Sequence, residues 1–202
     1  MKLFYTPGAC SLAPHIILRE AGLPVELVKV NLRDKTLDDG SDYRAINPKG
    51  SVPALQLADG QILSEAAVLV QYIADQAPQA NLIAAAGTLE RYRTQEWLNF
   101  ISSEVHKGFS PLFDPSYPAE AKAIAIDRLQ QRFALLDKHL ASHTWLLGEH
   151  FSVADAYLFT VSNWAGFVQL DISAHSHVQA YVQRVAQRPA VQEALRAEGL
   201  LG

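Results

Sequence analysis

The hydrophobic pattern of the chain changes near residue 80, and this change constrains the fold more than any other feature. Before it, short runs of β type alternate with helical periodicity, whereas after it almost every apolar pattern has helical spacing. The sequence therefore predicts a mixed α/β domain over residues 1–78 and an all-helical domain over residues 88–202. Pro78 and the Ala-Ala-Ala-Gly stretch before residue 88 predict a linker over residues 79–87.

The elements expected in the first domain come in the order β-α-β, then a connection, then β-β-α. A β-α-β unit favours a parallel strand pair, and the Ala58-Asp59-Gly60 turn predicts a hairpin that adds an antiparallel edge. This is the order of a thioredoxin-like domain. Strands are expected at 3–5, 25–30, 52–57 and 61–63, and helices at 11–21, near Tyr43, and from an N-cap at Ser64 to about 76, with further helices at 88–108, 119–142, 153–168 and 177–197.

The charge balance excludes several classes of partner. With 17 Lys and Arg against 21 Asp and Glu, the net charge is −4, which disfavours nucleic acid and anionic membranes as partners. No apolar run approaches the roughly 18 residues of a membrane span, and Pro7-Gly8 interrupts the N-terminus too early for a secretory signal. A cytoplasmic location is expected. The single cysteine excludes an intramolecular disulfide, and no metal site is expected.

Cys10 stands between a Pro-Gly turn and the start of a predicted helix. Free N–H groups at a helix N-terminus favour an anion, so a thiol there can become partly thiolate at neutral pH. The alternative is a buried cysteine that acts as a small apolar side chain. Ala13 stands where a redox dithiol would have its second cysteine, so a self-contained dithiol cycle is excluded.

Two further motifs in the first domain are suited to ligand binding. Pro53 cannot donate a hydrogen bond to a neighbouring strand and holds Val52 extended, so the backbone of Val52 can pair with an extended peptide. The alternative is that Pro53 is an ordinary proline of an edge strand with no role in binding. Glu65 and the N–H of Ala66 stand at a helix start and can bind an ammonium and a carboxylate, although a glutamate favoured there by the helix dipole is the simpler interpretation. Glu20, in contrast, is expected to be an exposed helix charge.

The helical domain contains one polar stripe. At about 100° per residue, Asn99, Ser103 and His106 fall within roughly 60° of one helix face, opposite an apolar stripe that includes Leu98 and Ile101. Such a stripe faces solvent by default, but it can also face a cleft between domains, where His106 would act as an acid, a base or a hydrogen-bond donor.

Taken together, these segments resemble the cytosolic glutathione transferases, and the cysteine motif resembles the bacterial Beta class. The match extends over the whole chain, with motifs in a consistent order and spacing. They are Tyr5–Ser11 (YTPGACS), Asn47–Leu55 (NPKGSVPAL), Ser64-Glu65, His106–Phe113 (HKGFSPLF) and Phe151–Tyr157 (FSVADAY), the last also containing a capping box from Ser152 to Asp155.

The resemblance implies a thioredoxin-like domain followed by an all-helical domain, a homodimer, and glutathione as co-substrate. It places Cys10 beside the glutathione sulfur, where a mixed disulfide can form. The remaining implied contacts are Lys35 with the glycyl carboxylate, Val52 with the tripeptide backbone, Glu65 and Ala66 with the γ-glutamyl end, and Asn99, Ser103 and His106 from the helical domain. Ala66 departs from the family pattern, in which a serine hydroxyl is common.

The implied activity is conjugation of the glutathione thiol to small hydrophobic electrophiles, with Cys10 and His106 as catalytic residues and detoxification as a typical use. Tyr5 and Ser11 match catalytic hydroxyls of other classes and rank below Cys10. Two alternatives stay open: glutaredoxin-like thiol–disulfide exchange through Cys10, and a non-catalytic binder of hydrophobic ligands or of a partner protein on the same fold.

Overall fold

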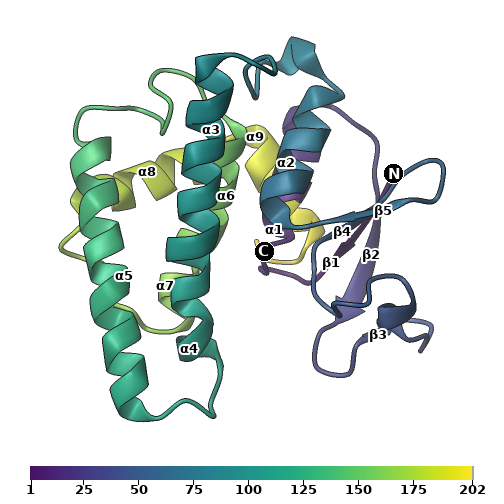
Figure 1. Cartoon of the computed structure of the whole chain (residues 1–202), viewed down its shortest axis with the longest axis horizontal. Coiled ribbons are helices and arrows are strands. Elements are labelled where there is room, and N and C mark those ends of the chain that lie inside the picture. The colour runs from purple at the N-terminus through teal and green to yellow at the C-terminus, as the bar shows by residue number, and fades with distance from the viewer. Residues whose placement is uncertain (202) are drawn as a thin grey trace. The chain divides into compact units, whose positions relative to one another are not determined.

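The computed structural model of the protein describes residues 1–201, which group into two compact units (Figure 1). One unit contains Met1–Ile83 together with the chain from Gln187 onward, and the other contains Ala84–Ala186. The sequence-based boundaries at residues 78 and 88 remain a prediction. Residues after Gln187 cluster with the first unit, although the sequence pattern assigns them to the helical domain.

The first unit is built on a five-stranded sheet of order β3-β2-β1-β4-β5. β1 and β2 are parallel and the other neighbouring strands are antiparallel, so the expected parallel pair and the β4–β5 hairpin are confirmed. The elements are β1 (Lys2–Tyr5), α1 (Leu12–Glu20), β2 (Glu26–Asn31), β3 (Thr36–Leu37), the 3-10 turn η1 (Tyr43–Ala45), β4 (Ala54–Gln56), β5 (Ile62–Ser64), α2 (Ala66–Asp75) and the 3-10 turn η2 (Pro78–Ala80).

Two details of this unit differ from the sequence-based expectation. Between β2 and the hairpin the sequence predicts only a connection with a short helix near Tyr43, but Thr36 and Leu37 pair with the end of β2 as the edge strand β3. Ser64 was expected to be the N-cap of α2, but it closes β5, and Glu65 occupies the N-cap position with φ 74°. Serine is a favoured N-cap residue, which is why the sequence pointed to Ser64, whereas a positive φ of the kind that Glu65 adopts is uncommon for a residue with a side chain.

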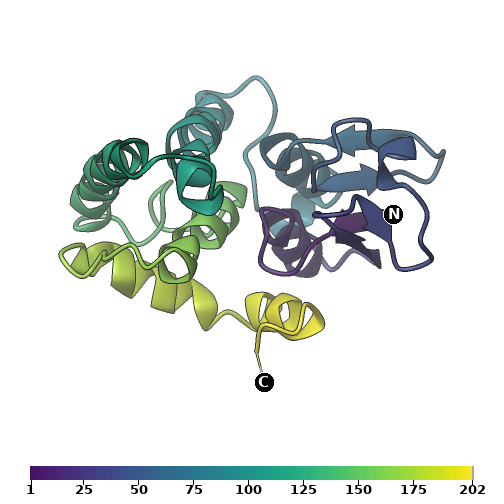
Figure 2. The same ribbon diagram turned by 90° about the horizontal axis from the view of Figure 1, so that it is seen from below.

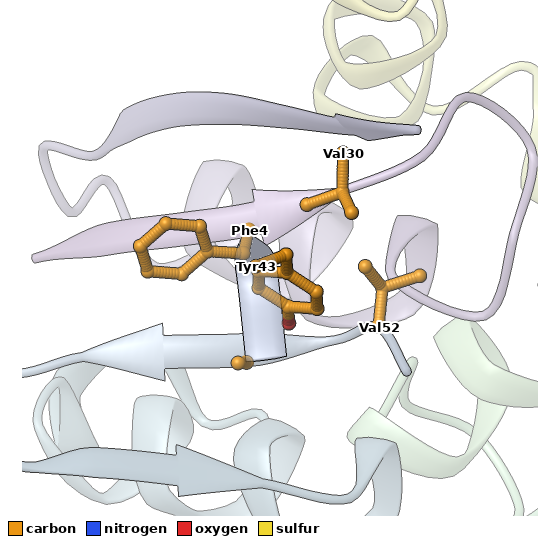
Figure 3. Packing of buried hydrophobic residues seen from close by; sticks show 5 residues of the cluster. Phe4, Val30, Tyr43 and Val52 are labelled. Atoms are coloured by element: carbon orange, nitrogen blue, oxygen red, sulfur yellow. The ribbon is translucent and has the colours of Figure 1, made fainter. Parts of the chain in front are cut away.

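A buried cluster on one side of the sheet holds the segment that precedes β4. It contains Phe4, Val30, Tyr43, Val52 and Ala54, and Figure 3 labels the first four of these residues. Tyr43 is fully buried, and its ring lies 5.6 Å from that of Phe4. Packing of this kind fixes the backbone around Val52, because a buried side chain in contact with several neighbours has few alternative positions.

The C-terminal helix α9 (Pro189–Ala197) packs against α1, as both ribbon views show (Figure 1, Figure 2). Val191 and Ala194 are its buried residues. The expectation that Glu20 is exposed is wrong: its carboxylate accepts hydrogen bonds from Arg188 Nε at 2.6 Å and Nη2 at 2.8 Å, and its side chain is only 11% exposed. Arg188 is 168 positions from Glu20, so no local sequence pattern indicates this pairing.

The second unit is helical. Its elements are α3 (Leu89–Phe100), the π-helical η3 (Ile101–His106), the 3-10 turn η4 (Lys107–Phe109), α4 (Ser110–Phe113), α5 (Ala119–Leu140), α6 (Val153–Ser162), α7 (Trp164–Phe167) and α8 (Ser176–Ala186). The helix expected at 177–197 is two helices, because the chain is extended at Arg188 and Pro189 begins α9. No helix of the described chain is long and apolar enough to cross a membrane.

Two contacts fix the elements around η3. An ideal Cβ on Gly108 would lie 2.8 Å from Leu129 Cδ2, so only glycine fits where η4 meets α5 without a shift of the packing. The expected capping box at the start of α6 is confirmed: Asp155 accepts hydrogen bonds from the backbone N and the hydroxyl of Ser152 at 2.8 and 2.7 Å. Every residue of α6 is buried, so this helix forms the centre of the unit.

Candidate functional site

The turn between β1 and α1 presents the only cysteine of the chain. Cys10 lies one residue before the helix N-cap Ser11, and its backbone carbonyl accepts a hydrogen bond from Ala13 N in the first turn of α1. The thiol is partly exposed, and its sulfur lies 3.1 Å from the carbonyl oxygen of Val52. Cys10 and Val52, which the sequence proposed separately, are therefore in contact. A cysteine that is partly exposed at a helix start has the accessibility that a reactive thiol requires.

The two hydroxyl residues ranked below Cys10 lie on either side of it: Tyr5 ends β1 and Ser11 is the N-cap of α1. Ser11 is fully buried, and its Oγ accepts from Thr6 N at 3.1 Å and donates to Thr6 O at 3.2 Å. Tyr5 is buried, and its pKa is raised by that burial and by the negative charges of Glu198 and Asp38. The hydroxyl of Ser11 thus closes the turn that carries Cys10.

The segment before Pro53 is held by side chains from the loop that precedes it. The carbonyl of Ser51 accepts hydrogen bonds from Tyr43 Oη at 3.0 Å and from Asn47 Nδ2 at 2.7 Å. The Val52–Pro53 peptide bond is cis. The sequence did not identify Asn47 as a positioning residue, although its place four residues before Ser51 in an Asn-Pro turn was a usable signal.

Lys35 reaches the same segment. Its backbone has φ 59°, and an ideal Cβ on Gly50 would lie 3.4 Å from Lys35 Cδ. The lysine stem therefore runs over Gly50, two residues from Val52. Cys10, Val52 and Lys35 are thus gathered at one end of the sheet of the first unit.

Glu65 stands at the start of α2 with an exposed carboxylate. Its side chain is 64% exposed, and Lys49 Nζ lies 2.6 Å from its Oε1 and 3.1 Å from Ser64 Oγ. Ala66 is the first residue of α2 and is buried. The first backbone N–H groups of a helix have no partner within the helix, so this end combines donors with a carboxylate. Lys49 was not among the predicted site residues.

A buried carboxylate that the sequence did not reveal also supports the Cys10 turn. Glu198, just after α9, accepts a hydrogen bond from Gly8 N at 3.0 Å and contacts His15 Nδ1 at 2.8 Å. Arg19 Nε in turn lies 3.4 Å from His15 Nε2. No sequence pattern around His15 indicates this partner, because Glu198 comes from the other end of the chain.

In the helical unit, the residues of the predicted polar stripe differ in exposure. Asn99 and Ser103 are exposed, with Ser103 Oγ donating to the Asn99 carbonyl at 2.9 Å, whereas His106 is half buried. The chain from Ile101 to His106 is π-helical, so the angle of 100° per residue assumed for the stripe does not hold along this segment. The apolar side is as expected, since Leu98 and Ile101 are buried.

His106 is half buried and held by aromatic residues of its own unit. Its Nδ1 lies 2.6 Å from the hydroxyl oxygen of Tyr157, and its ring meets that of Trp164 edge to face at 4.8 Å. Trp164 also contacts Phe113 edge to face at 5.5 Å, and both Phe113 and Phe167 are exposed. The helical unit therefore presents a fixed imidazole beside exposed aromatic surface, and among the described residues no cluster of three or more His, Cys, Asp or Glu is arranged to hold a metal ion.

Comparisons with known proteins identify the family. Residues 8–76 match the family model of the glutathione S-transferase N-terminal domain, and residues 100–189 match that of the C-terminal domain. Glutathione S-transferase GstA of Escherichia coli O157:H7 is 50% identical over 200 residues, which cover 99% of this chain and 100% of the relative.

Solved structures agree with this assignment. A ternary complex of BphK, a bacterial GST, has a TM-score of 0.98 at 52% identity, covering 99% of this chain and 100% of that one. A sphingomonad glutathione S-transferase complexed with glutathione and a Beta class enzyme of Sphingomonas chungbukensis each have a TM-score of 0.96 at 48% identity, with full coverage of both chains. These matches confirm the two-part fold, and the chain belongs to the glutathione S-transferases of the bacterial Beta class.

Proposed function

We propose that the protein binds glutathione and joins its thiol sulfur to small hydrophobic electrophiles. The family assignment makes it an enzyme of this reaction type. The observation that carries the proposal is the contact between Cys10 Sγ and the Val52 carbonyl at 3.1 Å, because it combines a thiol at a helix start with a backbone segment suited to pairing with a peptide. The sphingomonad relative, whose structure contains glutathione, supports the choice of thiol.

The first unit would bind most of the tripeptide. Val52 would pair with its backbone, and Lys35, whose stem passes over Gly50, would meet the glycyl carboxylate. Glu65 would bind the γ-glutamyl ammonium and the N–H of Ala66 the carboxylate beside it, which matches the charge of each group. The methyl group of Ala66 adds no hydroxyl contact, so the backbone donor alone would serve there.

The helical unit would contribute Asn99, Ser103 and His106. Asn99 and Ser103 are exposed neighbours with hydrogen-bonding side chains, and His106 has a fixed ring. With Cys10, His106 would be the catalytic pair: both would support the glutathione sulfur as a thiolate. That sulfur then donates an electron pair to the electrophilic carbon, the C–S bond forms, and the leaving group departs or the acceptor double bond takes the electrons. Orientation and charge stabilisation are the expected sources of rate gain.

The electrophile would be apolar. Phe113, which contacts Trp164, and Phe167 are exposed aromatic side chains of the helical unit, and their burial against an apolar ligand would be favourable. Detoxification of such compounds in the cytoplasm is the proposed physiological use. We also propose that the two domains are separated by a linker between residues 78 and 88.

A homodimer is also proposed. Val68 on α2, and Leu89 and Tyr92 on α3, are large apolar side chains that stay exposed in the single chain. Burial of such side chains against a second copy would be favourable. Light scattering after gel filtration should give about twice the 22.2 kDa of one chain, and a monomer at micromolar concentration would contradict this part of the proposal.

The activity is tested by steady-state conjugation of glutathione with a model aryl halide, together with calorimetric titration of glutathione. We expect turnover that saturates in glutathione, and binding without added metal. Glutathione binding without turnover of aryl halides, epoxides or α,β-unsaturated carbonyls would instead indicate a non-catalytic binder. Turnover confined to mixed disulfides would indicate exchange through Cys10.

A further inference from the structure

The hydroxyl oxygen of Tyr157 lies 2.6 Å from His106 Nδ1, and this contact holds the imidazole ring in its orientation. Tyr157 belongs to α6 and is 2% exposed, whereas His106 is half buried at the end of η3. The His106 ring also meets Tyr157 and Trp164 edge to face, at 5.9 and 4.8 Å between ring centroids. A short hydrogen bond and two ring contacts together leave the imidazole little freedom of rotation.

The hydrogen bond between Tyr157 and His106 favours one tautomer of the imidazole. A phenol is a stronger acid than a neutral imidazole N–H, so Tyr157 O–H donates and Nδ1 accepts. Because the hydrogen bond at one ring nitrogen decides which tautomer is present, the ring hydrogen of neutral His106 then lies on Nε2. An imidazole held in this way presents a donor rather than a base.

We infer that Tyr157 is a positioning residue, which holds His106 as the Nε2–H tautomer so that it donates a hydrogen bond to the thiolate sulfur of bound glutathione. The inference rests on the role proposed above for His106. His106 neither takes up nor gives up a proton in this step: the thiol proton of glutathione leaves to solvent, and the neutral imidazole donates a hydrogen bond to the thiolate that remains. A donor fixed before the ligand arrives requires no reorganisation during the reaction.

Two charged residues lie close to His106 in the chain, Glu104 and Lys107. Glu104, on the same π-helical segment, is paired with Arg132 of α5 through Nη2 at 2.6 Å and Nε at 2.9 Å. Lys107 follows His106 and is exposed. The hydrogen-bond partner that α6 supplies to the ring is Tyr157 itself.

Tyr181 provides a matched control for the loss of a buried phenol. It lies in α8 of the same unit, is fully buried, and donates its hydroxyl to Asp155 Oδ1 at 3.0 Å and to the Asp155 carbonyl at 3.1 Å. Tyr157→Phe and Tyr181→Phe therefore each remove one buried hydroxyl that is hydrogen-bonded. Of these two tyrosines, only Tyr157 contacts the His106 imidazole. Comparing the two variants therefore separates a general loss of stability from a specific loss of imidazole positioning.

The experiment measures kcat/KM for glutathione with a model aryl halide as a function of pH, in the wild type, Tyr157→Phe, His106→Ala, the double variant and Tyr181→Phe. For Tyr157→Phe we expect about a tenfold loss at neutral pH, the size of one good hydrogen bond, with recovery at high pH and little change in KM. The double variant should match His106→Ala, because the two residues act as a unit. Tyr181→Phe should keep the wild-type pH profile.

Two results would overturn the inference and leave the proposed function intact. The first is a wild-type pH profile of kcat/KM for Tyr157→Phe while that of His106→Ala is shifted. The second is a Tyr157→Phe substitution that lowers kcat/KM by the same factor in the wild type and in His106→Ala. A wild-type profile for His106→Ala would refute the proposed role of His106 and this inference with it. If Tyr157→Phe does not fold, nitrogen NMR of histidine-labelled wild-type protein decides: we expect the Nε2–H tautomer for His106, and the Nδ1–H tautomer would be contrary to the inference.

Discussion

His15 Nδ1 and Glu198 Oε1 lie 2.8 Å apart, and both side chains are fully buried. The other carboxylate oxygen of Glu198 accepts from Gly8 N, two residues before Cys10. The C-terminal segment therefore reaches both α1 and the turn that presents the thiol. A buried carboxylate is stable only while its hydrogen-bond partners remain, so this contact links the end of the chain to the stability of the first unit.

We predict that Glu198→Ala lowers the free energy of unfolding by about 3–5 kcal/mol, because it removes a buried carboxylate that accepts a hydrogen bond from Gly8 N and contacts His15 Nδ1. Urea unfolding followed by circular dichroism measures the change. Glu193→Ala is the matched control, since Glu193 is exposed on the adjacent helix α9 and should change stability by less than about 0.5 kcal/mol. Equal losses from the two variants would show that the buried pair contributes nothing specific.

The sequence predicted those parts of the site that depend on local patterns. Cys10, Val52 and Glu65 lie at element boundaries that turns, prolines and apolar runs define, and the structure places them there. It did not predict Glu198 as the partner of His15 or Arg188 as the partner of Glu20, because partners more than 160 positions apart are brought together only by tertiary packing.

The helical winding up to His106 was missed for a different reason. A wheel drawn at 100° per residue assumes α-helix throughout, and the π-helical winding from Ile101 to His106 breaks that assumption. A single extra residue per turn leaves no clear signal in an apolar pattern. The partner Tyr157 was likewise invisible, because it lies 51 positions away in a helix whose residues are all buried.

We predict that Glu65→Ala weakens glutathione binding by roughly tenfold or more, since a hydrogen bond to a charged ligand group is worth about 1.5–3 kcal/mol. Isothermal calorimetry with glutathione measures the change in Kd. The effect should appear without loss of stability, because the Glu65 side chain is 64% exposed and its pairing with Lys49 is a surface contact.

Glu26→Ala is the appropriate control for Glu65→Ala. Glu26 is also an exposed glutamate paired with a lysine, at 3.2 Å from Lys2 Nζ, but it lies on β2 away from the start of α2. Glu20, which the sequence alone would have offered for this purpose, is unsuitable because of its pairing with Arg188. The role of Glu65 would be refuted by equal Kd values for Glu65→Ala and Glu26→Ala.

The stability of the protein should fall on acidification, partly through His139. Burial lowers the pKa of His139 below its usual 6.5; the nearby His143 acts in the same direction, and the hydrogen bond to the Leu146 carbonyl opposes it. The unfolded chain then binds this proton more readily than the folded one. The stability linked to His139 is therefore complete above about pH 6.5 and is lost as the pH falls toward the lower folded value.

This prediction is checked by comparing urea midpoints at pH 7.5 and 5.5 in the wild type and His139→Gln. The wild type should lose more stability on acidification than the variant, in which this group no longer titrates. His177→Gln removes an exposed histidine and should keep the wild-type dependence. The same acid-induced loss in His139→Gln as in the wild type would assign the effect to other groups.

We predict that Cys10→Ala retains part of its conjugating activity but no longer forms a mixed disulfide with glutathione. In conjugation the attacking sulfur belongs to glutathione, and under the proposed function donors at the start of α1 and at His106 would still support its thiolate, so the loss should be partial. In disulfide exchange the protein sulfur is itself a reactant, and the chain has no other cysteine.

Two measurements on purified Cys10→Ala separate these roles: steady-state conjugation with a model aryl halide, and intact mass after incubation with oxidised glutathione. Cys10→Ser serves as the control for shape, because it keeps a donor of similar size that can still reach the Val52 carbonyl, 3.1 Å from the sulfur in the wild type. Conjugation should fall less in Cys10→Ser than in Cys10→Ala, and neither should gain the mass of glutathione. An adduct on either variant would mean that the modified atom is not Cys10. Complete loss of conjugation in both, with fold and glutathione affinity unchanged, would make the sulfur of Cys10 obligatory and would favour exchange over conjugation as its primary chemistry.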